Sequence, residues 1–236
     1  MTSLYTFTAP RSPCGYLADR EAQLHYEVAW EITPAEYEQR IDEGWRRFGH
    51  ALFRPACGHC DLCRPIRIPV ATFEPNRSQR RALQLNEDSV NITVNAPSAS
   101  RENLALYDRY HQAQHLSKGW PEYDPKDEES YLESFVVNPF ATEEWSYRID
   151  GRLVGVGYVD SLPKGLSAIY FIHDPEERHR SLGVFNILSI LRAAAAQKKP
   201  FVYLGYYVEG CRSMEYKLGY RPNELLGTDG VWRSYR

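Results

Sequence analysis

The sequence predicts an α+β fold, and three patterns support this prediction. Short segments alternate apolar and polar residues as strands do, whereas other segments repeat apolar residues every three or four positions, as helices do. The second half places several consecutive strand patterns between helical ones, which is typical of an antiparallel sheet flanked by helices. The composition of this 236-residue chain, with 43% hydrophobic and 25% charged residues, is ordinary for a globular protein.

The chain begins with two short strand patterns, at residues 5–8 and 25–30. A helix is expected to begin after Thr33, because Thr33 and Glu36 form the sequence pattern of a capping box. Apolar residues at helical spacing continue this pattern, so we expect the helix to reach Gly49.

Two further strands are expected before the middle of the chain. Residues 66–70 have the pattern of an edge or terminal strand, because their proline cannot donate a ladder hydrogen bond. Residues 90–94 alternate as another strand. We place a domain boundary after these strands. It predicts a smaller α+β domain at residues 1–97, rich in cysteine and arginine, and a second domain at residues 98–236.

The second half shows the clearer pattern. Two helices are expected at residues 98–116 and 127–137. A hairpin follows, whose two-residue turn is Asp150-Gly151, the sequence that a type I′ turn prefers. The remaining expected elements are a strand at residues 166–172, a long apolar helix at 184–197, a strand at 201–207 and a short helix at 212–218.

This order of elements resembles the acetyltransferase-like (GNAT) fold. Residues 180–183 (Arg-Ser-Leu-Gly) stand between a strand and a helix, where such enzymes bind an anion at a helix N-terminus. Tyr216 stands where their C-terminal tyrosine lies. However, Phe185 occupies a position that is usually small, and its bulk hinders the close backbone approach that a coenzyme A pyrophosphate needs. The pattern favours this fold but argues against acetyl-CoA as the donor.

Three of the five cysteines lie close together in sequence, at Cys57, Cys60 and Cys63. Such spacing is typical of zinc or iron–sulfur sites, which need four converging ligands. Cys14, which also stands beside a glycine, is the natural fourth ligand, and His59 is an alternative. The other interpretation is a reduced loop whose thiols only pack.

The cysteines lie within a strongly basic segment. Residues 45–81 hold eight arginines and two acids, although the formal net charge of the whole chain is -3. Such a segregated cluster predicts an anionic partner: nucleic-acid phosphate, a carboxylate, or both. Arg77, Arg80 and Arg81 share one face of a short helix that Asn76 can cap, and they are called the helix arginines below. A solvated helix face is the plainer alternative.

Five motifs spread over the chain, in order, form a recognisable set. They are Cys14-Gly-Tyr-Leu, Phe53-Arg-Pro-x-Cys-x2-Cys-x2-Cys, Asn76-Arg-Ser-Gln-Arg-Arg, Asp174-Pro-Glu-x-Arg-x-Arg-Ser-Leu-Gly, and the segment from Tyr203 to Lys217. Together they resemble the aminoacyl-tRNA–protein transferases, and most closely the bacterial aspartate/glutamate leucyltransferases, which are relatives of the eukaryotic arginyltransferases.

The resemblance implies transfer of an amino acid, leucine in the bacterial branch, from its tRNA to the N-terminal amine of a protein that begins with Asp or Glu. The product is a degradation signal. The implied partners are therefore Leu-tRNA, such acceptor proteins, and downstream proteolytic machinery. The donor is already an activated ester, so no ATP and no catalytic cofactor are expected, and the chain has no Gly-x4-Gly-Lys-Ser/Thr phosphate loop.

Roles in this reaction follow for several residues of the second half. Asp174 either anchors the acceptor's ammonium group or takes its proton, although as Asp-Pro it can also simply cap the next turn. Glu209 is a lesser candidate base. Tyr216 is a candidate to protonate the leaving ribose oxygen, or it packs beside a C-terminal strand. Lys217 is expected to neutralise nearby phosphate.

Substrate binding is expected from arginines, backbone amides and tyrosines. The helix arginines would recognise the acceptor's acidic side chain or contact tRNA phosphate. One of Tyr206 and Tyr207 would stack on the terminal adenine, because neighbouring side chains of a strand point to opposite faces. The residues expected to bind the tRNA 3′ terminus are Arg178, Arg180, Ser181, Leu182 and Gly183.

Three other functions stay open. Arginine could replace leucine as the transferred amino acid, the chain could be an N-acetyltransferase on the same fold, or it could be a non-enzymatic zinc-binding nucleic-acid module. No apolar run approaches 18 residues, and the first 30 residues lack the apolar core of a secretory signal. We therefore expect a cytoplasmic protein without a membrane segment.

Overall fold

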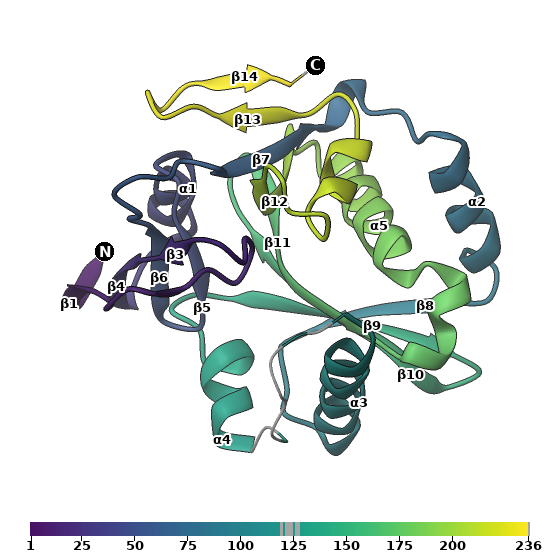
Figure 1. The fold of residues 1–236 in the computed structure, drawn as a ribbon. Helices are drawn as coiled ribbons and strands as arrows, with labels where there is room; N and C mark the ends of the chain where they lie inside the picture. Colours follow the sequence, from purple (N-terminus) through teal and green to yellow (C-terminus); the bar gives the residue numbers. More distant parts are fainter. Residues whose placement is uncertain (119, 121–124, 126–127, 236) are drawn as a thin grey trace.

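Two main β-sheets organise the chain, which has the α+β architecture that the sequence predicts (Figure 1). The computed structural model describes residues 1–118, 120, 125 and 128–235. The small sheet consists, in spatial order, of β1 (Thr2–Thr8), β4 (Leu24–Glu31), β6 (Ala51–Pro55) and β5 (Arg46–Phe48). A separate short ribbon pairs β2 (Ser12–Pro13) with β3 (Glu21–Ala22).

The large sheet is mixed. Its strands, in spatial order, are β14 (Trp232–Ser234), β13 (Glu224–Leu226), β7 (Cys63–Pro69), β12 (Phe201–Val208), β11 (Gly165–His173), β10 (Arg152–Ser161), β9 (Thr142–Ile149) and β8 (Asn91–Asn95). Of the strand pairs in the described residues, β11 and β12 run parallel and the others antiparallel.

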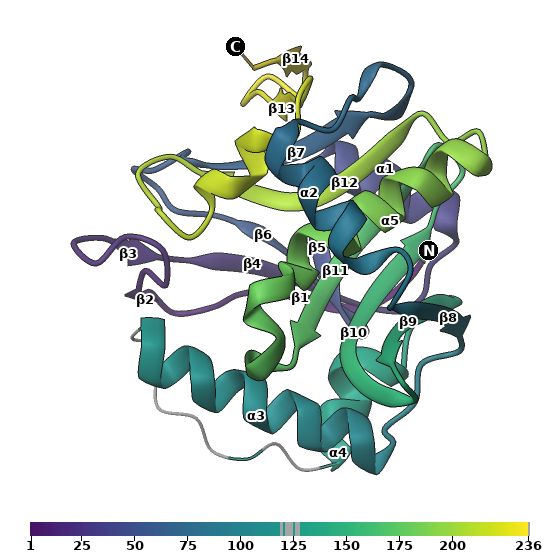
Figure 2. The same ribbon diagram turned by 90° about the vertical axis from the view of Figure 1, so that its right-hand side faces the viewer.

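Helices cover both faces of the large sheet (Figures 1 and 2). The α-helices are α1 (Pro34–Asp42), α2 (Arg77–Asn86), α3 (Arg101–Lys118), α4 (Glu128–Tyr131) and α5 (Leu182–Ala196). Shorter helical turns are η1 (Val70–Thr72), η2 (Leu132–Val136), η3 (Pro175–Arg180) and η4 (Glu215–Gly219). Apolar residues of α2 and α5 pack on one face, and those of α3, α4 and η2 pack on the other. None of the described helices is long and apolar enough to cross a membrane.

The large sheet contains strands from both sides of the predicted boundary at residue 97. β7 and β8 come from the first half of the chain and pair with β12 and β9 of the second half. A buried ion pair also joins the halves: Arg47 on β5 pairs with Asp160 on β10, and both side chains are fully buried. The Arg47 guanidinium donates as well to the hydroxyl of Thr142, at 2.6 Å, and to the carbonyl of Gly49.

Local signals placed several elements correctly. Asn76 caps α2, because its side chain accepts from the Gln79 amide while the Gln79 side chain accepts from the Asn76 amide. Thr33 and Glu36 form the same capping box at α1. The hairpin turn has the expected left-handed conformation, with φ of 49° at Asp150 and 81° at Gly151.

Two element predictions were wrong. The first helix ends at Asp42 instead of continuing to Gly49, because Gly44 has φ of 90°, which no helix accepts, and the chain then enters β5. β7 lies inside the large sheet, between β13 and β12, and not at an edge. Pro69 is the last residue of β7, and Pro65 lies opposite Tyr206, beside the register shift of β12. The predicted helix at 127–137 begins outside the described residues, and α4 with η2 forms the described part of it.

Candidate functional site

The large sheet opens between its two parallel strands (Figure 2). β11 and β12 pair only where residues 165–167 face residues 201–203, and both strands then continue without pairing to each other. β12 is irregular beyond this point, since Gly205 has φ of 72° and the pairing with β7 shifts register between Tyr203 and Tyr206. η3 and the start of α5 follow β11, and η4 follows β12. Asp174, the turn at residues 180–183 and Tyr216 therefore stand in the segments that follow these two strands.

The predicted anion-binding turn stands between η3 and α5. Ser181 is exposed and has φ of 55°, and nothing lies within 4 Å of a Cβ built on Gly183, so the turn is open on that side. The side chain of Leu182 is buried in the core and anchors the turn. The exposed guanidinium of Arg178 forms no ion pair with any described residue.

Arg180 is engaged with the protein itself. Its Nε donates to Glu177 at 2.9 Å, and its Nη1 donates to the hydroxyl of Ser89 at 3.0 Å and to the carbonyl of Leu85. The side chain of Asn86 in turn donates to the Arg180 carbonyl. Arg180 therefore ties the turn to the C-terminal end of α2 through Nε and Nη1, and its predicted contact with tRNA stays a prediction.

The helix arginines, Arg77, Arg80 and Arg81, lie exposed at the N-terminal end of α2. They form no ion pair within the described ranges; Arg80 donates only to the backbone carbonyl of Pro75. Because α2 has ten residues, its two ends are about 15 Å apart. The helix arginines and the η3–α5 turn therefore lie at opposite ends of one helix. They can contact different parts of an extended anion but do not converge on one group.

Other arginines of the basic segment are structural. Arg67 donates to Glu224 at 2.7 Å and lies over the ring of Phe201, at 3.7 Å from its centroid. Arg54 lies 4.9 Å from the centroid of the Trp45 ring. The local charge excess that predicted an anionic partner is thus partly compensated inside the protein.

Asp174 is a capping residue. Its side chain is buried and accepts from the backbone amide of Glu176, at the start of η3. It also accepts from Arg152 at 2.7 Å and lies 3.5 Å from Arg109. Of the three roles considered for Asp174, the cap is confirmed, and the roles as anchor or base stay predictions.

One of Tyr206 and Tyr207 was expected to stack on adenine, but both are buried, and this prediction was wrong. The hydroxyl of Tyr206 donates to the carbonyl of Gly44 at 2.7 Å, and its ring lies 5.3 Å from the guanidinium of Arg46. Tyr207 packs into the main core, with its ring 6.0 Å from that of Tyr235. The two rings pack into different clusters, Tyr207 in the main core and Tyr206 beside Val208 and Cys211, so β12 is covered on both faces here.

η4 carries one exposed and one buried candidate. Tyr216 is 54% exposed, whereas the neighbouring Lys217 is buried and its Nζ donates to the Tyr206 carbonyl at 2.6 Å. Burial first, and then the positive charge of Arg46, lower the pKa of Lys217 to about 8. Glu209 lies exposed in the turn that follows β12.

A row of aromatic rings crosses the small sheet toward β11, and the sequence analysis missed it. Consecutive ring centroids in this row are between 5.0 and 6.1 Å apart. The rings, in order, are Tyr5, Phe7, Tyr26, Phe53, Phe48 and Tyr170. Those of Tyr5 and Phe7 are about half exposed. The alternation of Tyr5 and Phe7 on one strand was the signal that could have revealed it.

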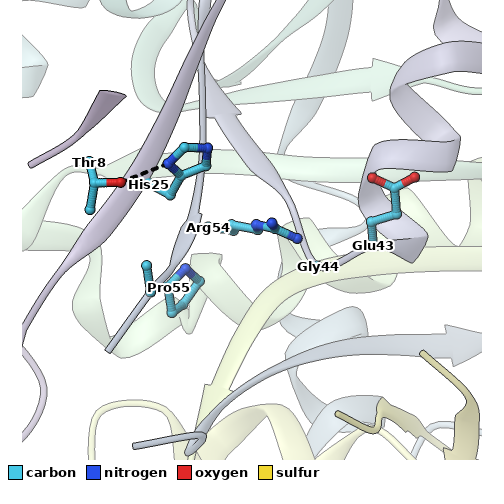
Figure 3. Close-up of a pocket in the computed structure, with 7 residues that line it drawn as sticks. Thr8, His25, Glu43, Gly44, Arg54 and Pro55 are labelled. Carbon is cyan, nitrogen blue, oxygen red and sulfur yellow. Dashed lines mark hydrogen bonds between the residues drawn. The ribbon is translucent and has the colours of Figure 1, made fainter. Parts of the chain in front are cut away.

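An open pocket of about 420 Å³ lies beside the small sheet (Figure 3). Its lining residues are Thr8, His25, Glu43, Gly44, Arg54, Pro55 and Ala56. The hydroxyl of Thr8 and Nδ1 of His25 are hydrogen-bonded at 2.9 Å. Because Glu43 and Arg54 balance each other in charge, this pocket has no excess of positive charge for an anion.

The four cysteines predicted as metal ligands are neighbours in space. The pKa of Cys63 is raised to about 12, first by burial and then by the charges of Cys14, Cys57 and Cys60. However, among the residues that the structure describes, no group of three or more His, Cys, Asp or Glu side chains is arranged to hold a metal ion. Cys57 instead accepts a hydrogen bond from the backbone amide of Gln23, at 3.3 Å.

Two family profiles match the chain. Residues 12–81 match the family described as "Arginine-tRNA-protein transferase, N terminus", and residues 102–227 match "Arginine-tRNA-protein transferase, C terminus". The chain belongs to the arginine-tRNA-protein transferase family. Both matched segments contribute strands to the large sheet, and residues of both border the opening between β11 and β12.

Curated members of this transferase family are similar to the chain over nearly their whole length. A protein named aspartate/glutamate leucyltransferase from Marinobacter nauticus is 38% identical, over 99% of this chain and 97% of its own. Proteins of the same name from Pseudomonas putida and Campylobacter jejuni are 40% and 34% identical, each over 93% of this chain and 92% of their own.

Solved structures are more distant. The structure named L-PGS from Bacillus licheniformis is 15% identical, covers 84% of this chain and 62% of its own, and has a TM-score of 0.48. This similarity is too low to carry an argument about fold or function.

Proposed function

We propose that the protein is an aminoacyltransferase that moves leucine from Leu-tRNA to the N-terminal amine of proteins beginning with Asp or Glu. One observation carries this proposal: similarity to proteins named aspartate/glutamate leucyltransferase over more than nine-tenths of both chains. The product is a protein with a new N-terminal leucine, which we propose is read as a degradation signal. Arginine as the transferred amino acid is the alternative, because the family description names arginine-tRNA.

The reaction requires little acid or base strength. The acceptor's α-amine has an ordinary pKa of about 7.7–8.0, so a useful fraction is neutral near pH 7. The amine nitrogen attacks the leucyl carbonyl carbon, and the ester bond to the ribose oxygen then breaks. Positioning of the two substrates supplies most of the rate, and stabilisation of the oxyanion and protonation of the leaving ribose oxygen supply the rest.

We propose that this reaction takes place at the opening between β11 and β12, on a GNAT-like C-terminal half. The order β9–β10–β11–α5–β12 supports that fold, as does the parallel pair that diverges beside a helix N-terminus. Tyr216 is half exposed on η4 at this opening, which suits the proton donor for the ribose oxygen.

The exposed cations and rings suit the tRNA. We propose that the helix arginines, together with Arg178, contact phosphates, since they are exposed and unpaired within the described residues. The aromatic row of the small sheet suits the unpaired bases of the 3′ end, which proteins read by stacking.

Replacing Arg77, Arg80 and Arg81 together by glutamine is expected to weaken binding of Leu-tRNA at least about tenfold and to make that binding less dependent on salt. Filter binding at several salt concentrations measures both effects. Replacement of the exposed Arg192, on α5, serves as the control. If the triple variant bound Leu-tRNA with wild-type affinity and salt dependence, the helix arginines would have no role in tRNA binding.

Two replacements of Asp174 separate its cap from its charge. Asparagine caps helices as well as aspartate does, whereas alanine cannot. We expect Asp174→Ala to lower the free energy of unfolding by about 1–2 kcal/mol and to reduce transfer, because η3 and the adjoining turn lose their anchor. Asp174→Asn should keep most of the stability and most of the transfer activity. A fully folded but inactive Asp174→Asn variant would show that the charge of Asp174 is needed, as an anchor for the ammonium group or as a base.

We propose a structural role for the cysteine group, whose thiolates would bind zinc or an iron–sulfur cluster. Thiolates are soft ligands for these metals, and the mutual proximity of Cys14, Cys57, Cys60 and Cys63 supports the choice. No step of the transfer reaction needs this metal. Metal analysis of protein purified without oxygen is expected to find zinc or iron, and a folded, active protein containing neither would refute the proposal.

The function itself is tested with labelled Leu-tRNA and Arg-tRNA, supplied separately with peptides that begin with Asp, Glu, Lys or Ala. The expected result is leucine incorporation into the Asp and Glu peptides alone. Arginine incorporation would favour the alternative donor. Absence of any transfer product, with equal binding of charged and uncharged tRNA, would favour a nucleic-acid-binding module.

A further inference from the structure

Two positively charged side chains are buried together at the bulge of β12 without an acidic partner. Arg46 is 6% exposed and Lys217 is 7% exposed. Both donate only to backbone carbonyls: Arg46 to Gly205 at 3.1 Å and to Trp45, and Lys217 to Tyr206 at 2.6 Å. In the part of the chain that the structure describes, neither forms an ion pair. Buried charges are normally paired, so this arrangement lacks an anion.

A small space lies between the two cations. A Cβ built on Gly205 would lie 4.0 Å from Nε of Arg46 and 4.0 Å from Nζ of Lys217, and it would meet no other atom as near apart from its own chain neighbours. Nε of Arg46 is buried and has no hydrogen-bond partner among the described residues. The left-handed backbone at Gly205 and its missing side chain together keep this space open.

The electrostatics of the space favour a bound anion. Burial lowers the pKa of Lys217 to about 8, and the nearby charge of Arg46 contributes to this shift. An anion between them would relieve this repulsion and would accept from the unpaired Nε–H group. Two donor groups facing one small space suit the two oxygens of a carboxylate.

We propose that this cradle, formed by Arg46, Lys217 and Gly205, binds the side-chain carboxylate of the acceptor's N-terminal Asp or Glu. The inference rests on the proposed function and names the group that gives it acceptor specificity. A tRNA phosphate fits less well, because its two ester substituents would have to enter a buried space, whereas the helix arginines offer exposed contacts. In this proposal the helix arginines bind the tRNA, and the cradle binds the acidic side chain of the acceptor.

The first test measures acceptor preference. Peptides that differ only in an N-terminal Asp or Asn are supplied with Leu-tRNA to the wild type and to Lys217→Gln, Lys217→Arg and the control Lys198→Gln, whose lysine is exposed after α5. We expect Lys217→Gln to lower kcat/KM for the Asp peptide by about 10²-fold, mainly through KM. KM for Leu-tRNA should stay unchanged, and the residual transfer to the Asn peptide should stay at its wild-type level. Lys217→Arg should recover part of the preference, and Lys198→Gln should behave as the wild type.

Other outcomes overturn the proposal. An equal loss with both peptides would make Lys217 a structural residue, and a raised KM for Leu-tRNA with an intact preference for Asp would assign the cradle to phosphate.

Calorimetry with the peptides and no tRNA separates this inference from the proposed function. The wild type should bind the Asp peptide more tightly than the Asn peptide, even if no transfer is observed. Equal affinities would refute the cradle alone.

A second test needs no variant and therefore does not depend on folding of Lys217→Gln. A carbodiimide activates the carboxylate of a peptide that begins with Asp and has a blocked C-terminus, and a nearby lysine amine then forms an amide with loss of the urea. Mass spectrometry of the wild type should find the Asp peptide coupled to Lys217. The matching Asn peptide should give no such product. Exclusive modification of exposed lysines would overturn the proposal.

Discussion

Replacing Tyr216 by phenylalanine is expected to lower kcat for leucine transfer by at least about 10²-fold, with KM for Leu-tRNA unchanged. The substitution removes one oxygen atom and keeps the ring. The leaving ribose oxygen departs as an alkoxide unless a proton reaches it, and general acid catalysis at such a step typically contributes factors of this size. Tyr216 is half exposed at the opening of the sheet, whereas most neighbouring tyrosines are buried.

Tyr220 provides the matched control for this prediction. It lies in the same segment, and its buried hydroxyl has no hydrogen-bond partner in the part of the chain that the structure describes. Tyr220→Phe should therefore leave both kcat and stability close to the wild type. Single-turnover measurements with labelled Leu-tRNA give the chemical rate directly. Wild-type kcat in Tyr216→Phe would show that water or another group protonates the ribose oxygen.

Replacing Arg47 by leucine is expected to lower the free energy of unfolding by about 3–5 kcal/mol. The pair with Asp160 is fully buried, so removal of Arg47 leaves a carboxylate without its counterion inside the protein. Burial already raises the pKa of Asp160, and Arg47 opposes that shift. Chemical denaturation monitored by circular dichroism measures the loss.

The stability loss of Arg47→Leu is expected to depend on pH in a definite direction. Without Arg47, the folded-state pKa of Asp160 rises further above its unfolded value, so the folded state binds a proton more readily than the unfolded state. The deficit of Arg47→Leu should therefore shrink as the pH falls from neutral and the carboxyl becomes neutral. The double variant Arg47→Leu with Asp160→Leu should recover much of the loss, because no buried charge remains. Wild-type stability of the single variant would contradict the importance of this pair.

Local interactions made several elements predictable. The capping boxes at Thr33 and Asn76 and the turn at Asp150-Gly151 depend on residues within four positions of each other, and all three formed as expected. The failure at residues 43–49 has the opposite cause. Apolar residues there have helical spacing, but pairing of β5 with β6 is a contact between separate segments, which periodicity cannot reveal.

The candidate site also combines features that were predictable from the sequence with features that were not. The arginine-rich segment and the η3–α5 turn were identified from composition and motif, and the helix arginines are exposed as a binding surface requires. Tyr206 and Tyr207 failed because each is buried by partners that are distant in sequence. Composition counts charges and rings, but it does not show which of them the protein uses for its own packing.

Motifs in the sequence by themselves determined the family, and with it the kind of reaction, since motif order and local propensities are properties of the linear chain. The tertiary structure alone decided which cations are free, which are neutralised and which are buried without a partner. Arg46 and Lys217 meet across the bulge at Gly205 because strand pairing brings distant segments together, and the energy of a charge depends on the water and partners around it. That surrounding exists only once the chain has folded.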